Sequence, residues 1–582
     1  MPRILIANRG EIAVRIIRAC AQTGHTSIAV YADQDIEAMH TQLADEAHAL
    51  PGTSAADTYL SIDALLAAAR ASDADAVHPG YGFLSENAEF AAAVKDAGLI
   101  WIGPTATTIR ALGDKVTARR IAEKVGAPLA PGIDRPLAGA AEVEEFAAAH
   151  GLPIIIKAAH GGGGRGMKIV RDLAEAAEAF DSATREALEA FGRPECFVEK
   201  YLERPRHVEV QILGDGHGRT VAVGDRDCSA QRRNQKLIEE APAPNLGHDQ
   251  RERLHRAAED ICAAVDYRGA GTVEFLLAAD GTMTFLEVNT RLQVEHPVTE
   301  AVSGVDLVAE QFRIAFDGEL GLAATPEPRG HAIELRINAE DPGRGFLPTP
   351  GRIEALTVPG GPGVRWDAGV RSGDTVQAAF DSLFAKLIVH GPDRATAIAR
   401  TLTAARELQV SGPATVLPCT LEILTDPAFA SADLGIHTQW IESELMPRFT
   451  AQSRPAPVAE ASLRRFTVDL DGRRATLGLP ADLIAHLGAG VGSRDAGTEN
   501  ADTGDAGDGT GSDPTAVAAP VPGNLVDYLV SDGAEVSEGD DIAVLSAMKM
   551  ETRIPAHRSG ILHQVASIGD MVSVGETIAR ID

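Results

Sequence analysis

The sequence predicts an α/β protein of several domains that ends in a flexible linker and a small all-β barrel. Residues 3–31 show the pattern of a strand, a helix and a second strand, which opens a doubly wound α/β domain. Residues 491–514 are almost entirely small or acidic, so they cannot bury enough apolar surface to fold. Residues 515–582 repeat a short glycine and valine pattern, which indicates two similar halves. With 582 residues, the chain is long enough for about four domains.

The first domain is expected over residues 1–113. Its residues 3–7 (RILIA) are apolar and predict a buried strand. Glu11 to Cys20 predict a helix, because the apolar residues in this segment recur at helical spacing. A second strand is expected at Ser27 to Tyr31. The arrangement resembles a dinucleotide fold that lacks the GxGxxG signature.

Another α/β unit is expected over about residues 114–205, and strands and helices continue over about 206–445. The apolar strand Pro153 to Ala159 leads into a glycine loop that ends at Gly166, and a second strand follows at Met167 to Val170. Glycine loops can fold their backbone closely over phosphate groups. The loop joins two strands and does not match the Walker A spacing, so Lys157 and Lys115 are needed to support a phosphate site.

The last quarter of the chain is expected to be rich in β-structure on both sides of the linker. Residues 446–490 form a small β-rich connecting region, in which 465–479 predict a hairpin with its turn at Asp471-Gly472. The linker at 491–514 contains six acidic residues and one arginine. In the barrel, a three-residue pattern recurs 36 residues later (Gly533, Val536 and Gly539, then Gly569, Val572 and Gly575). The segment between the two halves is expected to be a hairpin that exposes Lys549 at its tip.

Composition excludes several classes of protein. The chain has 83 acidic and 53 basic residues and a net charge of −30, whereas a nucleic-acid binder would show a basic face. No apolar run approaches the ~18–20 residues of a membrane helix. The five cysteines are scattered, which argues against a disulfide framework or a zinc site. We therefore expect a soluble protein of the cytoplasm that binds neither nucleic acid nor membranes.

The most specific local pattern is a predicted hairpin at residues 271–290. A two-residue turn at Asp280-Gly281 would place Glu274 directly opposite Glu287, and Thr272 opposite Asn289. One face of the hairpin would then carry Glu274, Glu287 and Asn289, and the other Val273, Phe275, Leu286 and Val288. Opposed carboxylates repel unless a cation lies between them, and these oxygen ligands suit Mg²⁺ with a bound nucleotide.

Polar residues that could bind a small anion lie on either side of this hairpin. Arg291 and Glu295 follow it and suggest an anion pocket with a carboxylate able to act as a base. The segment from Gln231 to Lys236 precedes it and adds further cations.

Together these segments resemble a known family. The motifs HPGYGFLSEN (78–87), GDK (113–115), GGGGRGM (161–167), EKYLERPRHVEVQ (199–211), RDCSAQRRNQK (226–236), EEAPAP (239–244), EVNTRLQVEHPVTE (287–300) and RINAEDP (336–342) closely resemble biotin carboxylase, an ATP-grasp enzyme. AMKME (547–551) with its repeat resembles the biotin carboxyl carrier domain. The chain thus resembles the α subunits of biotin-dependent acyl-CoA carboxylases.

The resemblance implies a carboxylase N-terminal domain (1–113), an ATP-grasp domain (114–310) with a mobile lid at about 130–205, a carboxylase C-terminal domain (311–445) and a carrier (515–582). It implies nucleotide contacts from Lys115, Lys157, Gly163, Gly164, Glu199, Lys200, Leu202, His207 and Gln231. Magnesium or manganese would bind to Glu274, Glu287 and Asn289. Biotin would be attached to Lys549.

The resemblance also implies the chemistry. Lys236, Arg291, Gln293 and the backbone of Val294 would hold bicarbonate, and Glu295 would deprotonate it for attack on ATP. Arg365, in GVRWDAG, would stabilise the biotin enolate. Departures from the family pattern are His160 in the glycine loop, Asn234 in place of a histidine, and Ser546 before AMKM.

The expected partners are a separate carboxyltransferase subunit, a biotin protein ligase and further copies of the chain. The acyl-CoA substrate stays open, since the partner would select it. Two alternatives are a carrier or scaffold whose ATP-grasp part has decayed, and another ATP-grasp ligase such as a carbamoyl-phosphate or purine-pathway enzyme. The residues Lys236, Arg291, Glu295 and Arg365 argue against the first alternative, and AMKME argues against the second.

Overall fold

The computed structural model describes residues 1–133, 135–159, 166–449, 463–470, 473–480, 515–520, 523–547, 550–572 and 575–582. The predicted linker at 491–514 lies outside the described residues, as do Gly163, Gly164, Lys549 and the turn residues Asp471 and Gly472.

The N-terminal layer is a five-stranded parallel sheet in the order β3-β2-β1-β4-β5. Its strands are β1 (Arg3–Ile6), β2 (Thr26–Tyr31), β3 (Glu46–Ala49), β4 (Ala76–His78) and β5 (Ile100–Trp101), and its helices are α1 (Gly10–Thr23), α2 (Met39–Leu43), α3 (Ile62–Ala71), α4 (Ala88–Asp96) and α5 (Ala106–Gly113). Side chains of Ser61, Asn87 and Thr105 cap α3, α4 and α5 by accepting a backbone N–H bond. The predicted doubly wound opening is therefore confirmed.

The centre of the molecule is an eight-stranded sheet in the order β13-β12-β9-β10-β11-β14-β21-β19. Its strands are β9 (Arg206–Asp215), β10 (Thr220–Arg232), β11 (Gln235–Ala241), β12 (Arg268–Leu277), β13 (Met283–Asn289), β14 (His331–Asn338), β19 (Val364–Ala368) and β21 (Leu383–Gly391). Because β11 pairs with β14, the sheet runs without a break across the domain boundary expected at residue 310.

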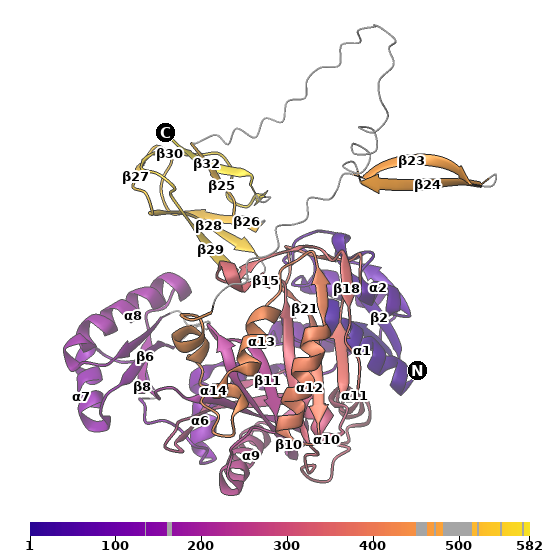
Figure 1. Ribbon diagram of the computed structural model, residues 1–582. Coiled ribbons are helices and arrows are strands. Elements are labelled where there is room, and N and C mark those ends of the chain that lie inside the picture. Colours follow the sequence, from indigo (N-terminus) through magenta and orange to yellow (C-terminus); the bar gives the residue numbers. More distant parts are fainter. Residues whose placement is uncertain are drawn as a thin grey trace.

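Helices and short strands surround this sheet (Figure 1). The helices are α6 (Lys115–Lys124), α9 (His248–Ala263), α10 (His296–Ser303), α11 (Leu307–Asp317), α12 (Arg394–Glu407), α13 (Leu417–Thr425) and α14 (Pro427–Ala430). The short strands are β15 (Glu340–Asp341), β16 (Leu347–Pro348), β17 (Gly351–Arg352), β18 (Ala355–Thr357), β20 (Thr375–Val376) and β22 (Gln409–Ser411). Ile333, Leu335 and Ile337 of β14 point into the largest apolar core, so the alternate residues of this strand face away from it.

A smaller unit lies beside the main sheet, on the left in Figure 1. It consists of the antiparallel sheet β7-β6-β8, formed by β6 (Ile154–Ala158), β7 (Met167–Val170) and β8 (Cys196–Lys200), and of helices α7 (Ala140–His150) and α8 (Ala176–Phe191). It has its own apolar core, which includes Val143, Ile156 and Val198. The predicted strands on both sides of the glycine loop are confirmed.

The β12–β13 hairpin differs from the prediction near its turn. Glu274 pairs with Glu287 and Thr272 with Asn289, as predicted. The turn is longer than two residues, and a bulge after Glu274 shifts the register so that Phe275 pairs with Phe285. Phe285 is therefore the buried core residue, whereas Leu286, predicted for the core face, lines the central cavity.

The C-terminal domain consists of two four-stranded sheets in the orders β25-β32-β30-β27 and β29-β28-β26-β31. Its strands are β25 (Ala516–Ala518), β26 (Gly523–Tyr528), β27 (Glu535–Val536), β28 (Asp541–Ala547), β29 (Met550–Pro555), β30 (Gly560–Gln564), β31 (Met571–Val572) and β32 (Thr577–Ile581). The repeated valines Val536 and Val572 are both buried, and the repeated glycines have φ between +79° and +95°. Ala547 of β28 pairs with Met550 of β29.

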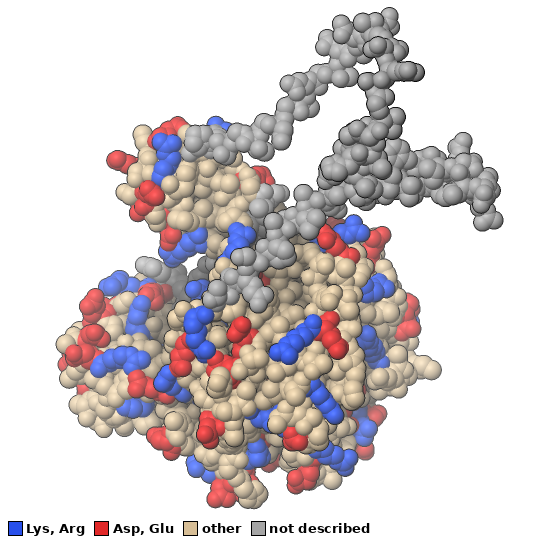
Figure 2. Space-filling view, in the orientation of Figure 1, with Lys and Arg blue, Asp and Glu red and all other residues tan. Residues whose placement is uncertain are grey.

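The connecting region contains β23 (Leu463–Leu470) and β24 (Arg473–Pro480), which pair in antiparallel fashion as predicted. Acidic and basic side chains are intermingled over the face shown in Figure 2. Among the described residues, no helix has both the length and the apolar character required to cross a membrane.

Candidate active site

A cavity of about 1310 Å³ lies between the N-terminal layer, the β7-β6-β8 unit and the central sheet. It brings together every described site residue predicted from the sequence except Arg365. These residues are Lys115, Lys157, Glu199, Lys200, Leu202, His207, Gln231, Lys236, Glu274, Glu287, Asn289, Arg291, Gln293, Val294 and Glu295. Residues far apart in the chain thus converge because the sheet and the two flanking units share this space.

One end of the cavity carries a chain of ion pairs around Glu199 on β8. Its carboxylate accepts hydrogen bonds from Lys157 on β6 and from Arg119 on α6, each at 2.6 Å. Burial opposes ionisation, but these two cations hold the pKa of Glu199 below its usual range. Lys115, the first residue of α6, lies 4.0 Å from Glu287 and is partly exposed to the cavity. This end therefore presents several cations where phosphate groups could bind.

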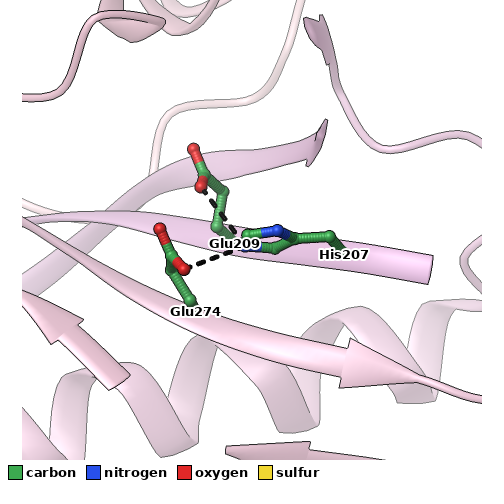
Figure 3. Close-up of side chains that lie close together, drawn as sticks. All are labelled: His207, Glu209 and Glu274. Carbon is green, nitrogen blue, oxygen red and sulfur yellow. Dashed lines mark ion pairs between the residues drawn. The ribbon is translucent and has the colours of Figure 1, made fainter. Parts of the chain in front are cut away.

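His207 and Glu274 form an ion pair in the middle of the cavity (Figure 3). Nε2 of His207 lies 3.0 Å from Glu274 and 3.9 Å from Glu209, and Nδ1 lies 3.1 Å from the side-chain amide of Gln231. Although burial lowers the pKa of His207, the Glu274 carboxylate raises it overall. Glu209 already accepts bonds from Arg226 (2.5 Å) and Lys236 (2.6 Å). The charge of Glu209 is thus compensated by Arg226 and Lys236.

A divalent cation fits the group formed by Glu274, Glu287 and Asn289 better than it fits the group in Figure 3. Glu274 and Glu287 are direct cross-strand partners, and burial together with the charge of Glu274 raises the pKa of Glu287. Among the described residues, Lys115 is the cation paired with Glu287, and at 4.0 Å it compensates the charge of this carboxylate poorly. Asn289 lies beside them, with its amide nitrogen 2.8 Å from Glu274. Carboxylate and amide oxygens are the ligands that Mg²⁺ and Mn²⁺ accept, so the residues fit the predicted metal.

Glu295, immediately before α10, is held between two cations. Its Oε1 accepts a bond from Lys236 on β11 at 2.5 Å, and its Oε2 accepts one from Arg336 on β14 at 3.0 Å. Only 1 % of Glu295 is exposed. Burial raises its pKa, but Lys236 and Arg336 outweigh this effect and hold the pKa below the usual range. Glu295 is therefore an ionised carboxylate at the wall of the cavity.

Other parts of the fold hold the loop between Asn289 and Glu295. Arg291 donates to Asn289 and, at 2.8 Å, to Glu86 of the N-terminal layer. Lys386 of β21 donates to the backbone oxygen of Val294 at 2.7 Å. The N-terminal layer and the central sheet thus both hold this loop in place.

Arg365 does not join this group. It lies on β19 and pairs with Glu300 and Asp367, both at 2.7 Å. Together with Arg15, Arg18 and other residues it lines a separate cavity of about 420 Å³. The arginine that contacts Glu295 is Arg336.

The structure thus does not bring Arg365 together with the other predicted site residues, and it places Arg336 beside Glu295. Arg336 begins the RINAEDP motif, in which the sequence predicts no site residue. Its alternation with the core residues Leu335 and Ile337 could have indicated that it faces away from the core. Arg119 and Glu86 were also missed, and nothing local in the sequence links either of them to the site.

The fold and the site define an ATP-grasp enzyme joined to a biotinyl/lipoyl-type barrel. Family models match in order: biotin carboxylase, N-terminal domain, at residues 1–109; carbamoyl-phosphate synthase L chain, ATP binding domain, at 114–323; biotin carboxylase C-terminal domain at 334–443; and biotin-requiring enzyme at 515–581. The chain is 50 % identical to the biotin-dependent acyl-coenzyme A carboxylase alpha3 subunit of Mycobacterium leprae, over 100 % of this chain and 98 % of that protein. The protein therefore belongs to the biotin-dependent acyl-CoA carboxylase α subunits.

Solved structures agree with this assignment. The biotin carboxylase of Campylobacter jejuni, in a complex with β,γ-ATP, is 41 % identical and covers 76 % of this chain and 98 % of its own, with a TM-score of 0.71. The biotin carboxylase domain dimer of 2-oxoglutarate carboxylase from Hydrogenobacter thermophilus, in complex with MgADP, ADP and bicarbonate, is 41 % identical over 77 % of this chain and 99 % of that chain, with a TM-score of 0.72.

Proposed function

We propose that the protein uses ATP and bicarbonate to carboxylate biotin attached to its own Lys549, and that a separate carboxyltransferase subunit passes the carboxyl group to an acyl-CoA. The observation that carries the proposal is the cavity in which Glu295, Lys236 and Arg336 lie beside the divalent-cation residues and the Lys157–Glu199 pair. A base, anion-binding groups and phosphate-binding groups are thus present in one space.

The residues of the chain would act as follows. Lys115, Lys157, Gly163 and Gly164 bind the phosphates of ATP, Glu199, Lys200 and Leu202 surround the adenine, and His207 and Gln231 lie toward the ribose. Glu274, Glu287 and Asn289 hold the magnesium ion, which neutralises phosphate charge when bound. This assignment is supported by Lys157 and Arg119, the two cations that pair with Glu199, and by the poorly compensated charge of Glu287.

Bicarbonate would lie between Lys236, Arg291, Gln293 and the backbone of Val294. Glu295 accepts its proton, and the resulting dianion attacks the γ-phosphorus of ATP, forming carboxyphosphate and releasing ADP. Arg336, on the other side of Glu295, would stabilise negative charge that develops at the carboxyl acceptor. Biotin supplies the nitrogen that carries the carboxyl group to the second active site.

The setting of the enzyme is part of the proposal. A biotin protein ligase would modify Lys549, and copies of the chain would assemble with each other and with the carboxyltransferase. All five cysteines are buried free thiols, which supports the reducing environment of the cytoplasm. We also propose the domain limits that the sequence predicts. The second and third domains share one sheet, because β11 pairs with β14.

The test is ATP hydrolysis by the purified full-length protein with free biotin. We expect release of phosphate that depends on both bicarbonate and biotin. No hydrolysis above background would instead favour a carrier or scaffold, and hydrolysis that is indifferent to both additions would contradict the proposed reaction.

A further inference from the structure

Two buried carboxyl groups lie behind the active site. Glu239 on β11 and Glu334 on β14 are direct cross-strand partners, and both are 0 % exposed. Among the described residues, neither oxygen of Glu334 nor Oε2 of Glu239 has a hydrogen-bond partner. Buried carboxyl groups are costly unless they are paired, so each calls for an explanation. The reaction proposed above uses neither of them.

Glu239 is linked to the catalytic base through one guanidinium group. Its Oε1 accepts a hydrogen bond from Nε of Arg336 at 2.6 Å. Nη2 of the same arginine donates to Oε2 of Glu295 at 3.0 Å. Because a guanidinium is planar and rigid, a bond that fixes Nε also fixes the direction in which Nη2 points.

We propose that Glu239 is a positioning residue for biotin carboxylation, which holds the Arg336 guanidinium against Glu295 and offsets part of its charge. This inference rests on the proposed function. Without Glu239, the bond to Nε that fixes the orientation of the Arg336 guanidinium would be lost, and the guanidinium could turn into the cavity. Its positive charge would also no longer be offset when it faces Glu295. A carboxylate that faces an uncompensated cation is a weaker base. The charge on Glu239 therefore preserves both the geometry and the basicity that Glu295 needs.

The charged groups around Glu239 allow a prediction of pH dependence. Arg336 and Glu334 face it from β14, Glu295 from the loop before α10, and Lys236 from its own strand, while Lys386 acts on Glu334 from β21. Burial raises the pKa of Glu239 to about 7, although Arg336 opposes this shift. Below this pH the carboxyl group becomes protonated and loses the charge that offsets Arg336. The rate should therefore rise as the pH increases through about 7.

The test is the substitution Glu239→Gln in the full-length enzyme. Glutamine keeps the size and an acceptor oxygen but lacks the charge. We expect kcat for bicarbonate-dependent ATP hydrolysis to fall about ten-fold or more, with the KM for ATP within about two-fold of wild type. The inflection near neutral pH should disappear from the pH profile. A second variant, Glu239→Asp, retains a charge that can titrate and should keep this inflection while lowering kcat.

Glu240→Gln is the matched control. Glu240 is the next residue on β11 and is also buried and paired, but with Arg394 and His331, away from the cavity. It should keep kcat within about two-fold and retain the inflection. The inference is overturned if Glu239→Gln keeps the wild-type kcat and pH profile, or if both glutamine variants lose kcat equally. A wild-type enzyme without bicarbonate-dependent hydrolysis would refute the proposed function instead.

Discussion

Replacing Arg336 with glutamine should distinguish the arginine that contacts the proposed base from Arg365, for which the family resemblance predicts the enolate-stabilising role. Nη2 of Arg336 lies 3.0 Å from Glu295, and the arginine lines the main cavity. Arg365 has its own partners, Glu300 and Asp367, and lies at the separate cavity. The two variants Arg336→Gln and Arg365→Gln remove the same charge from different places.

The expected size of the effect follows from the geometry. A preorganised donor directed at developing negative charge typically supplies about 3–4 kcal/mol, which corresponds to about 10²–10³ in kcat. Arg336 also donates a hydrogen bond to Glu295, so its loss removes a contact that positions the base. Arg365→Gln removes the partner of Asp367 and one of the two arginines that pair with Glu300, which keeps Arg15 at 2.8 Å. This loss should lower stability by about 1–3 kcal/mol and kcat by less than about three-fold.

The assay is bicarbonate-dependent ATP hydrolysis with free biotin, accompanied by thermal unfolding of each variant. We expect Arg336→Gln to lose kcat with an unchanged KM for ATP, and Arg365→Gln to lose mainly thermal stability. The reasoning fails if Arg336→Gln keeps its kcat, or if Arg365→Gln loses as much activity while its melting temperature is unchanged.

Three further predictions concern the metal, the carrier and the N-terminal layer. Glu287→Gln should raise the Mg²⁺ concentration for half-maximal ATP hydrolysis by about ten-fold or more, because Glu274 would be the only remaining carboxylate ligand; an unchanged requirement would contradict the site. Lys549→Arg should abolish avidin binding but spare ATP hydrolysis with free biotin, and avidin binding by this variant would place the attachment elsewhere. Asp35 is buried, and its carboxylate accepts three hydrogen bonds from Arg9 and a tyrosine. These partners hold its pKa below the usual range despite its burial. The ionised carboxylate therefore stabilises the fold at pH 7, and this contribution is lost as the pH falls below about 4. Asp35→Asn should therefore lower the melting temperature at neutral pH, by a margin that narrows on acidification; an equal margin at both pH values would argue against the ion pair.

The sequence was most informative where one short segment contains both interacting partners. Glu274 and Glu287 belong to one hairpin, so alternation and a turn were sufficient to pair them. The glycine and valine repeat predicted the two halves of the barrel for a different reason, because a recurring sequence pattern indicates a recurring local structure. Even within the hairpin, the bulge after Glu274 was not predicted, because its position depends on how Phe275 and Phe285 pack in the core.

The tertiary structure was needed wherever the partner comes from a distant segment. Glu295 lies between Lys236 and Arg336, which are on adjacent strands of the sheet but far apart in the chain. Arg336 and Arg365 both lie on strands of that sheet, and no local pattern shows which one faces Glu295. The pairing of Glu86 with Arg291 likewise depends on how the N-terminal layer docks.

The sequence by itself thus determined the order of the domains and the residue types of the site, because short local motifs indicate both. It also determined the paired carboxylates, because they belong to one hairpin. Only the tertiary structure decided which arginine contacts the base, that Glu239 orients it, and that one sheet joins the second and third domains. Those features depend on which strands become neighbours, and strand order is set by the packing of the whole core rather than by any one segment.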